Sequence, residues 1–244
     1  MYNSNDYQAN YENLEFENHL RIYRMKHVTN YIHSVKSDKI LEIGSGSWPL
    51  FEFFNAYEVL DIVEPGEYFY KTTKNKASNN DRVSVTHGLI EEVYPTLSND
   101  YDIILIGGFL HEIENPKEVL EVIKKIAKKE TIVISYVPNA DSFHRLLAFE
   151  AGIINSKYQY SKNDVLFGRR SVFNKDSFSA IFEESSFSIL NIDTYFIKAF
   201  TNEQMEHLMN VSFLNERLLT GFSKMIEYMP DMGAEIFLAA RILD

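Results

Sequence analysis

The stretch KILEIGSGSWPLF, residues 39–51, constrains the fold more than any other part of the sequence. A short apolar run is followed at once by Gly44 and Gly46, and then by Trp48 and Pro49. Glycine lets the backbone take positive φ and approach a ligand closely. In an open parallel sheet, ligands bind beyond the carboxyl ends of the strands, beside the first strand. The stretch therefore predicts a strand that ends in a nucleotide-binding turn.

Further apolar, β-branched runs follow, and each is closed within two residues by glycine or proline. They span residues 58–63, 82–86, 101–106 and 131–136. Helical spacing is present at residues 14–35 and again in PKEVLEVIKKIAKK, which begins with Pro116 and ends in lysines. Such runs with helical connections predict a parallel sheet covered on both faces. After this come helical signals at 141–151, 176–184 and 202–228, and strand signals at 187–197 and 234–241.

The pattern predicts one α/β domain with a three-layer, Rossmann-like fold, in which a seven-stranded, mostly parallel sheet carries a helical cap. The length of 244 residues fits one large domain. The parts that we expect are an N-terminal helical lid (1–36), a cofactor-binding core (37–137), a cap insert (138–175) and a C-terminal part that closes the sheet (176–244).

Composition excludes several classes of function. The formal net charge of −11 disfavours a nucleic-acid surface, which needs a basic stripe. The absence of cysteine excludes disulfides and thiolate metal sites, and we expect no metal because His111 with Glu112 or Glu114 lacks a distant partner ligand. No apolar run reaches the ~20 residues of a membrane span. The polar N-terminus lacks the features of a signal peptide, so we expect a cytoplasmic location.

Two acids near the glycines indicate which nucleotide the turn receives. Glu64 follows Gly44 by 20 residues, at the end of the second predicted strand, where a carboxylate can accept hydrogen bonds from ribose hydroxyls. The alternative is a plain turn with a solvated glutamate. The dinucleotide fingerprint needs a third glycine where this chain has Pro49, which argues against NAD. Glu42 is expected to point at the same pocket, where an acid repels a pyrophosphate and attracts an ammonium group.

The order acid-x-Gly-x-Gly in LEIGSGS resembles the first motif of the class I S-adenosylmethionine-dependent methyltransferases, which normally carry a third glycine at the position of Trp48. The strings VEPGEYFY, VTHGLIEEV and YDIILIGGFLHEIENP resemble the second, third and fourth motifs, in order and at the expected spacing. VISYVPNADSFHRLLAFEAGII and FIKAFTNEQME resemble a subgroup associated with surface-polysaccharide and small-molecule methylation. The resemblance covers residues 37–205.

This resemblance implies S-adenosylmethionine as the cofactor and S-adenosylhomocysteine as the product. It makes Glu64 the ribose acid and places Leu89 and Ile90 beside the adenine. The aromatic N-terminal segment is expected to fold over the cofactor, with simple helix packing as the alternative. The expected cofactor-binding residues are Glu42, Gly44, Ser45, Gly46, Glu64, Pro65, Gly88, Leu89, Ile90, Gly107, Gly108, Tyr11 and Arg24.

The acceptor side offers histidines and basic residues. His111 follows the fourth predicted strand, and His144 lies on a helix expected to begin at the cleft; both are candidate catalytic bases or acceptor contacts. The alternatives are a backbone hydrogen bond for His111 and a buried structural role for His144. The candidate substrate-binding residues are Arg145, Arg169, Arg170, Asn139 and Lys198. The basic ones can form an anion-binding rim, or can instead pair with acids of the chain.

We therefore expect methyl transfer to a small polar acceptor, in the form of oxygen methylation of a sugar, nucleotide-sugar or phosphorylated metabolite in surface-glycan biosynthesis. One alternative is a nucleotide-dependent oxidoreductase on a similar sheet, against which Glu42, Pro49 and the two late strands argue. Another is a methyltransferase-like binding protein without activity. The sequence leaves open the oligomeric state and whether Trp48 packs on the first helix or borders the pocket.

Overall fold

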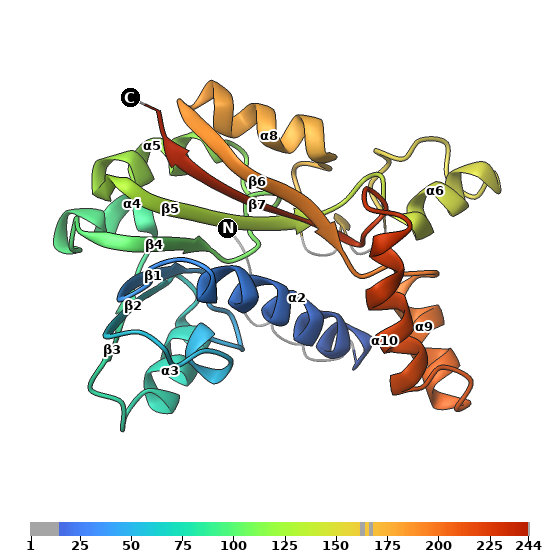
Figure 1. Cartoon of the computed structure of the whole chain (residues 1–244), viewed down its shortest axis with the longest axis horizontal. Helices are drawn as coiled ribbons and strands as arrows, with labels where there is room; N and C mark the ends of the chain where they lie inside the picture. Colours follow the sequence, from blue (N-terminus) through green and yellow to red (C-terminus); the bar gives the residue numbers. More distant parts are fainter. Residues whose placement is uncertain (1–14, 162–163, 166–167, 244) are drawn as a thin grey trace.

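The computed structural model describes residues 15–161, 164–165 and 168–243, which form a three-layer α/β fold (Figure 1). The strands are β1 Lys39–Ile43, β2 Val59–Glu64, β3 Val83–His87, β4 Tyr101–Ile106, β5 Ala127–Pro138, β6 Phe187–Tyr195 and β7 Glu235–Ile242. They form one seven-stranded sheet in the order β3-β2-β1-β4-β5-β7-β6. Pairs among the first five strands are parallel, and β7 runs antiparallel to both β5 and β6. The predicted seven-stranded, mostly parallel sheet is confirmed.

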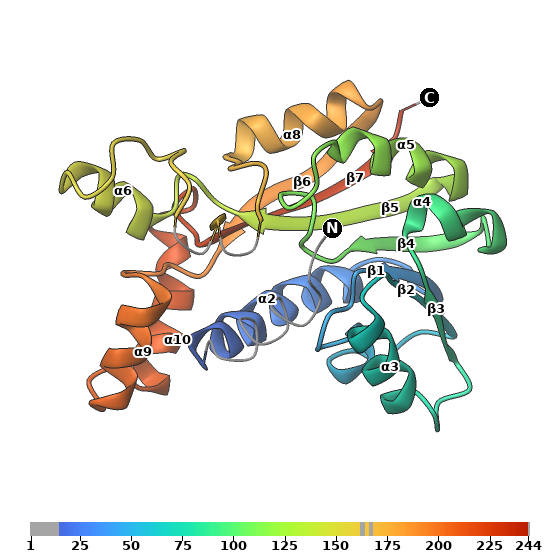
Figure 2. The ribbon, with the colours of Figure 1, turned by 180° about the vertical axis from the view of Figure 1, so that it is seen from behind.

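The sheet is buried on both faces because its strands are apolar at successive positions. In β4, Ile103 and Leu105 belong to one core, and Ile104 and Ile106 belong to the other. This alternation follows from the period of two along a strand. The first core lies under α2 (Glu15–His33), and the second lies under α5 (Pro116–Ile126) and α8 (Lys175–Glu184). Figure 2 shows these helices on opposite faces of the sheet.

The other α-helices in the described ranges are α3 Glu67–Lys76, α4 Ile90–Val93, α6 Phe143–Glu150, α9 Asn202–Asn210 and α10 Glu216–Lys224. In both views α6, α9 and α10 gather beyond one end of the sheet (Figures 1 and 2). Because β5 ends there and β7 begins there, this end is where a ligand site of the sheet is expected. Among the described residues, no helix combines the length and hydrophobicity that a membrane span needs.

The first crossover differs from the helical connections that the sequence pattern predicts. Between β1 and β2 the described chain forms a 3₁₀ turn, η1 (Leu50–Glu52), and no α-helix. Pro49, in an extended conformation at the start of this turn, has no N–H to donate. The Leu50 N–H instead donates to the buried carboxylate of Glu42 at 2.9 Å. A side chain of the strand therefore satisfies the amide that opens the turn.

Two predicted boundaries are also different in the structure. β5 begins at Ala127, inside the stretch predicted as helix, because Ala127 pairs with Tyr101 before a register shift in the ladder. The helical stretch predicted at 202–228 is divided into α9, α10 and the 3₁₀ turn η3 (Met225–Glu227). Ser212 has a φ of 58° between the two helices, and the Asn215 side chain caps the start of α10.

Candidate active site

The glycine turn brings the carboxyl ends of β1 and β4 together. Gly44 and Gly46 have φ angles of 77° and 54°, which glycine adopts without steric cost. The Gly107 N–H donates to the Ile43 carbonyl at 2.7 Å. A Cβ on Gly107 would lie 2.2 Å from the Gly44 carbonyl oxygen, so a side chain does not fit between these strand ends. The turn thus exposes backbone rather than side chains at the edge where a nucleotide is predicted.

Glu64 lies at the end of β2 and is 4% exposed. Its carboxylate accepts the Gly46 N–H at 2.9 Å and the Gly66 N–H at 2.8 Å, and the Ser45 hydroxyl at 3.4 Å. Burial raises the pKa of Glu64, and the backbone hydrogen bonds partly oppose that rise. The predicted ribose acid therefore already holds the glycine turn in place.

Glu42 lies near the end of β1, and its carboxylate is turned toward the start of η1. Both carboxylate oxygens accept the Leu50 N–H, at 2.9 and 3.2 Å, and the residue is 3% exposed. Burial raises its pKa to about 8, and the neighbouring charge of Glu64 adds to the rise. Strand β1 directs this side chain toward η1, which sequence spacing alone did not reveal.

These two buried acids fit a positively charged nucleoside ligand. In the described part of the chain, neither Glu42 nor Glu64 forms an ion pair. Uncompensated buried carboxylates are costly, and a nearby cation favours their charged form. A ligand that brings both positive charge and ribose hydroxyls to this edge is chemically matched to them.

The other predicted cofactor residues are distributed unevenly around the turn. The Pro65 carbonyl lies 3.2 Å from His87 Nε2, and Gly88 has a φ of 147°. Leu89 is 49% exposed, whereas Ile90 is buried in the core and does not offer its side chain to a ligand from outside. Tyr11 lies outside the described residues.

Trp48 packs at the edge of the turn. It is 41% exposed, and its ring lies 5.2 Å from the Arg21 guanidinium and 5.5 Å from the Lys76 ammonium. Arg21 belongs to α2, and Lys76 ends α3. Trp48 thus contacts both α2 and α3 through cation–π interactions.

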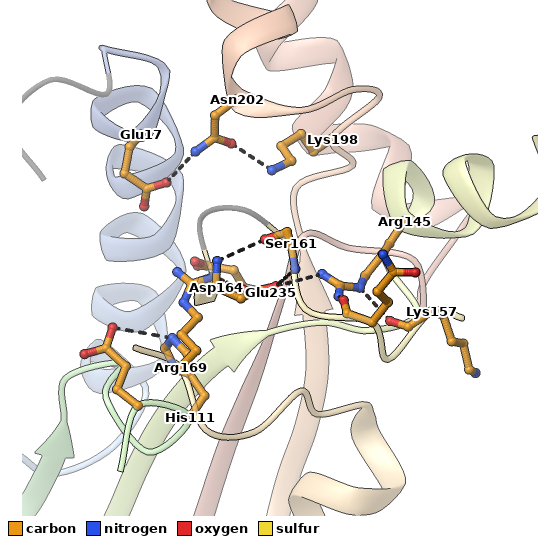
Figure 3. A network of polar contacts seen from close by, with 12 residues as sticks. Glu17, His111, Arg145, Lys157, Ser161, Asp164, Arg169, Lys198, Asn202 and Glu235 are labelled. Carbon is orange, nitrogen blue, oxygen red and sulfur yellow. Dashed lines mark hydrogen bonds and ion pairs between the residues drawn. The ribbon is translucent and has the colours of Figure 1, made fainter. Parts of the chain in front are cut away.

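A cavity of about 1320 Å³ lies beyond the carboxyl ends of β4 and β5. Gly107 and Gly108 line it, so it adjoins the glycine turn. The Tyr136 ring at the end of β5 also lines it; a Cβ on Gly108 would lie 2.4 Å from that ring. The volume exceeds the ~300–1,000 Å³ of a typical small-molecule pocket. Figure 3 shows the polar side chains around this space.

His111 is the polar residue in the cavity wall whose setting is most unusual. It is 4% exposed, and neither ring nitrogen has a hydrogen-bond partner among the described residues. Nε2 lies 3.6 Å from Oε1 of Glu112. Burial, and then the positive charge of Arg169, lowers the pKa of His111 well below its ordinary range. The imidazole is therefore neutral near pH 7 and able to accept a proton.

His144 and Asn139 line the same cavity but differ in their hydrogen bonding. His144 lies on α6, and its buried Nδ1 also lacks a partner among the described residues. Burial, Lys198 and Arg145 lower its pKa well below the ordinary range. The Asn139 amide donates to the carbonyls of Asp231 and Gly233, at 3.0 and 2.9 Å, and its oxygen accepts a backbone N–H. Asn139 is therefore committed to holding the chain before β7.

The predicted basic rim is largely neutralised by the chain itself. Arg145 and Arg169 both line the cavity, and both pair with Asp164, at 3.5 and 2.7 Å (Figure 3). Arg145 Nε also donates to the Lys157 carbonyl at 2.6 Å. Arg170 is exposed and is not part of the cavity wall. Sequence reasoning placed two of the arginines at the cavity but missed Asp164, which is 4% exposed.

A buried ionic network joins α2 to β7 on the other side of the cavity. Arg24 pairs with Glu235 through two guanidinium nitrogens and with Glu17 at 2.8 Å. Asn202 of α9 donates to Glu17 at 3.1 Å and accepts from Lys198 at 2.8 Å (Figure 3). Burial lowers the pKa of Lys198 to about 8. Arg24, predicted as a cofactor contact, is thus held by two acids that no sequence motif indicated.

Comparison with known proteins agrees with this geometry. Residues 41–135 match the family model described as the methyltransferase domain. The fold is that of the S-adenosylmethionine-dependent methyltransferases. A methyltransferase of Thermotoga maritima, described as a possible histamine N-methyltransferase, aligns with a TM-score of 0.64 at 15% identity over 96% of this chain and 94% of its own. No curated protein sequence matches.

Two further structures extend the comparison of this methyltransferase fold. The plantazolicin methyltransferase BpumL, solved with S-adenosylhomocysteine, has a TM-score of 0.59 at 20% identity over 98% of this chain and 89% of its own. A methyltransferase of Aquifex aeolicus has a TM-score of 0.57 at 12% identity over 92% of both chains. The matched domain indicates S-adenosylmethionine as the cofactor.

Proposed function

We propose that the protein transfers a methyl group from S-adenosylmethionine to a polar atom of a small molecule bound in the cavity, with His111 as the base. The observation that carries this proposal is the setting of His111. A buried, neutral imidazole without a hydrogen-bond partner among the described residues lines the cavity where that cavity adjoins the glycine turn. A histidine buried in this way for structure alone is expected to be hydrogen-bonded.

The chain has residues to hold the donor on one side of this junction. Glu64 fits the ribose, the Gly44–Gly46 turn fits the adjoining backbone contacts, and the exposed Leu89 fits one face of a base. Bound S-adenosylmethionine supplies an electrophilic methyl group on a sulfonium. The protein's own contribution is to orient the acceptor in line with that group and to exclude water from the junction.

His111 then serves the acceptor. An acceptor oxygen or nitrogen must lose a proton as its new bond to carbon forms, and a neutral imidazole within the wall can take it. The lowered pKa keeps His111 neutral and so available as a base, although it also makes the imidazole a weak one. His144, on α6, also lines the cavity, and its Nδ1 has no hydrogen-bond partner among the described residues.

Oxygen methylation of a sugar or phosphorylated metabolite, in surface-glycan biosynthesis, is the finer form that the sequence favours. It is supported by Arg145, Arg169 and Lys198, which all line the cavity. It requires the two arginines to leave Asp164 for the acceptor. The similar structures do not choose the atom, because they are described as a possible N-methyltransferase, a 7-O-methyltransferase and a carbon methyltransferase.

The proposal is tested with methyl-labelled S-adenosylmethionine and a small-molecule metabolite extract. We expect label to pass into low-molecular-weight products with the wild type and to fall by a factor of ~10²–10⁴ with His111→Asn. His33→Asn, which removes an exposed histidine at the end of α2, is the matched control and should keep full transfer. Equal transfer by the His111 variant and the wild type would remove the proposed base.

A further inference from the structure

Among the described residues that line the cavity, carboxylates outnumber basic side chains. Among the described lining residues the acids are Glu17, Glu112, Asp164, Glu203, Glu206 and Glu235. The bases are Arg24, Arg145, Arg169 and Lys198. With neutral histidines, six acids against four bases leave a formal charge of −2. Low-dielectric walls of one sign focus the field inside a cleft and raise the local concentration of ions of the opposite sign.

Ion pairs within the chain also limit how many of these cations are available to a ligand. Three of the four cations are already engaged by carboxylates of the chain: Arg24 by Glu235 and Glu17, and both Arg145 and Arg169 by Asp164. An anionic acceptor must therefore compete with buried acids for its partners. Lys198, the fourth cation, has its pKa lowered to about 8 by burial and so weakens as a cation just above neutral pH.

Two of these acids lie on α9, and a third lies beside His111. Glu203 and Glu206 are on α9, and neither side chain forms a hydrogen bond or an ion pair within the described ranges. Glu112 places a carboxylate oxygen 3.6 Å from His111 Nε2. The imidazole itself is 4% exposed and has both nitrogens without a hydrogen-bond partner in the described chain. Acidic residues and a proton acceptor in the wall are what an ammonium group needs.

From this arrangement we propose that the acceptor is a small amine that enters as a cation and is methylated at nitrogen. This proposal names the substrate class of the proposed methyltransferase and rests on that function. The ammonium first gives a proton to His111 and so becomes nucleophilic. The amine nitrogen forms the new N–C bond as the methyl C–S bond breaks, and the bonding pair stays on sulfur, leaving a neutral thioether. The product is an N-methylammonium, and the proton on His111 passes to solvent.

Binding of matched compounds tests the proposal apart from turnover. Ethanolamine, tyramine and agmatine are each compared with the N-acetylated counterpart and with glucose 6-phosphate, by calorimetry on protein saturated with S-adenosylhomocysteine. We expect at least one amine to bind 10-fold or more tightly than its acetylated form and than glucose 6-phosphate. Its affinity should fall several-fold between 50 and 300 mM salt, because the attraction is electrostatic. Mass spectrometry should then find the N-methylated amine after incubation with S-adenosylmethionine.

A double variant of the two acids on α9 tests whether they attract the amine. Glu203→Gln with Glu206→Gln should weaken amine binding about 3- to 10-fold and leave S-adenosylhomocysteine affinity unchanged. Glu227→Gln, an exposed acid of η3 outside the cavity wall, is the control and should change neither. Tighter binding of glucose 6-phosphate than of every amine, or no amine binding, overturns the amine proposal while leaving methyl transfer intact. Absence of S-adenosylhomocysteine binding in the same protein would instead contradict the proposed function itself.

Discussion

Glu42 should make the protein less stable as the pH rises from 5 to 8. Burial raises the pKa of this carboxyl from 4.5 to about 8 in the folded chain. Between these values the folded state holds a proton that the unfolded state has lost, so folding stability falls with rising pH and levels off above about 8. Each pH unit in this interval lowers the unfolding free energy by ~1.4 kcal/mol. Relative to its value at low pH, the unfolding free energy is therefore lower by about 3 kcal/mol at pH 7 and by about 5 kcal/mol at pH 8.

The variant Glu42→Gln isolates this contribution because its amide oxygen can still accept the Leu50 N–H and cannot ionise. Urea unfolding of both proteins at pH 5, 6, 7 and 8 gives the difference in unfolding free energy at each pH. We expect the unfolding free energy of the variant to rise relative to that of the wild type at each higher pH, by several kcal/mol between pH 5 and pH 8. Glu150→Gln, an exposed acid at the end of α6, serves as the control for loss of one charge. Parallel curves for Glu42→Gln and wild type would refute a buried, uncompensated carboxyl.

Three further predictions concern the turn and the cavity wall. Arg24→Met should lower the unfolding free energy by about 3–5 kcal/mol, because Glu17 and Glu235 lose their buried partner, whereas Lys71→Met, in an exposed pair, should change it by less than ~1 kcal/mol; urea titration checks both. Gly107→Ala should weaken S-adenosylhomocysteine binding at least 10-fold, because its Cβ would lie 2.2 Å from a backbone oxygen. In the control Gly221→Ala the new Cβ has open space, so this variant should bind with wild-type affinity in the same calorimetric titration. Burial lowers the pKa of Lys198 from 10.5 to about 8, so the unfolding free energy of the wild type should rise between pH 8 and pH 10.5. Lys198→Met lacks this rise, so urea denaturation at both pH values should show its unfolding free energy falling by about 3 kcal/mol relative to wild type over the interval.

The sheet could be predicted from the sequence because its signals are local. β1 and β4 have the bounds that their apolar runs predict, and the period of two in β4 assigns its isoleucines to two cores. The end of α5 could not be placed, because Lys128 and Lys129 suit a helix end. There the pairing of Ala127 with Tyr101 on β4 decides the boundary, and that contact is not visible in a local window.

The candidate site was predicted in part. The glycines and Glu64 carry a recognisable spacing, and His111 follows a strand whose end could be read, so these residues could be named. The acids that pair with the basic residues could not. Glu235 lies 211 residues from Arg24, and Asp164 lies in a stretch without regular spacing. Their effect is that Arg24, Arg145 and Arg169 are each paired with an acid of the chain, which is the alternative that the sequence left open for the arginines of the rim.

The hydrogen-bond partner of Glu42 could not be predicted from its motif. Its position two residues before Gly44 indicated a ligand contact. The structure turns its carboxylate toward the Leu50 amide, because the first crossover has a 3₁₀ turn in place of a helix and its opening N–H needs an acceptor. A spacing rule carries no information on how the neighbouring connection folds.

The central claim is that the β1–β2 edge binds an adenosyl sulfonium rather than a dinucleotide, and calorimetric titration tests it most directly. S-adenosylmethionine and S-adenosylhomocysteine should each bind the wild type at one site, NAD should not bind, and Glu64→Ala should weaken both adenosyl ligands at least 10-fold. Glu92→Ala, an exposed acid on α4, should leave both affinities unchanged. Tight binding of NAD without binding of either adenosyl ligand would contradict the account.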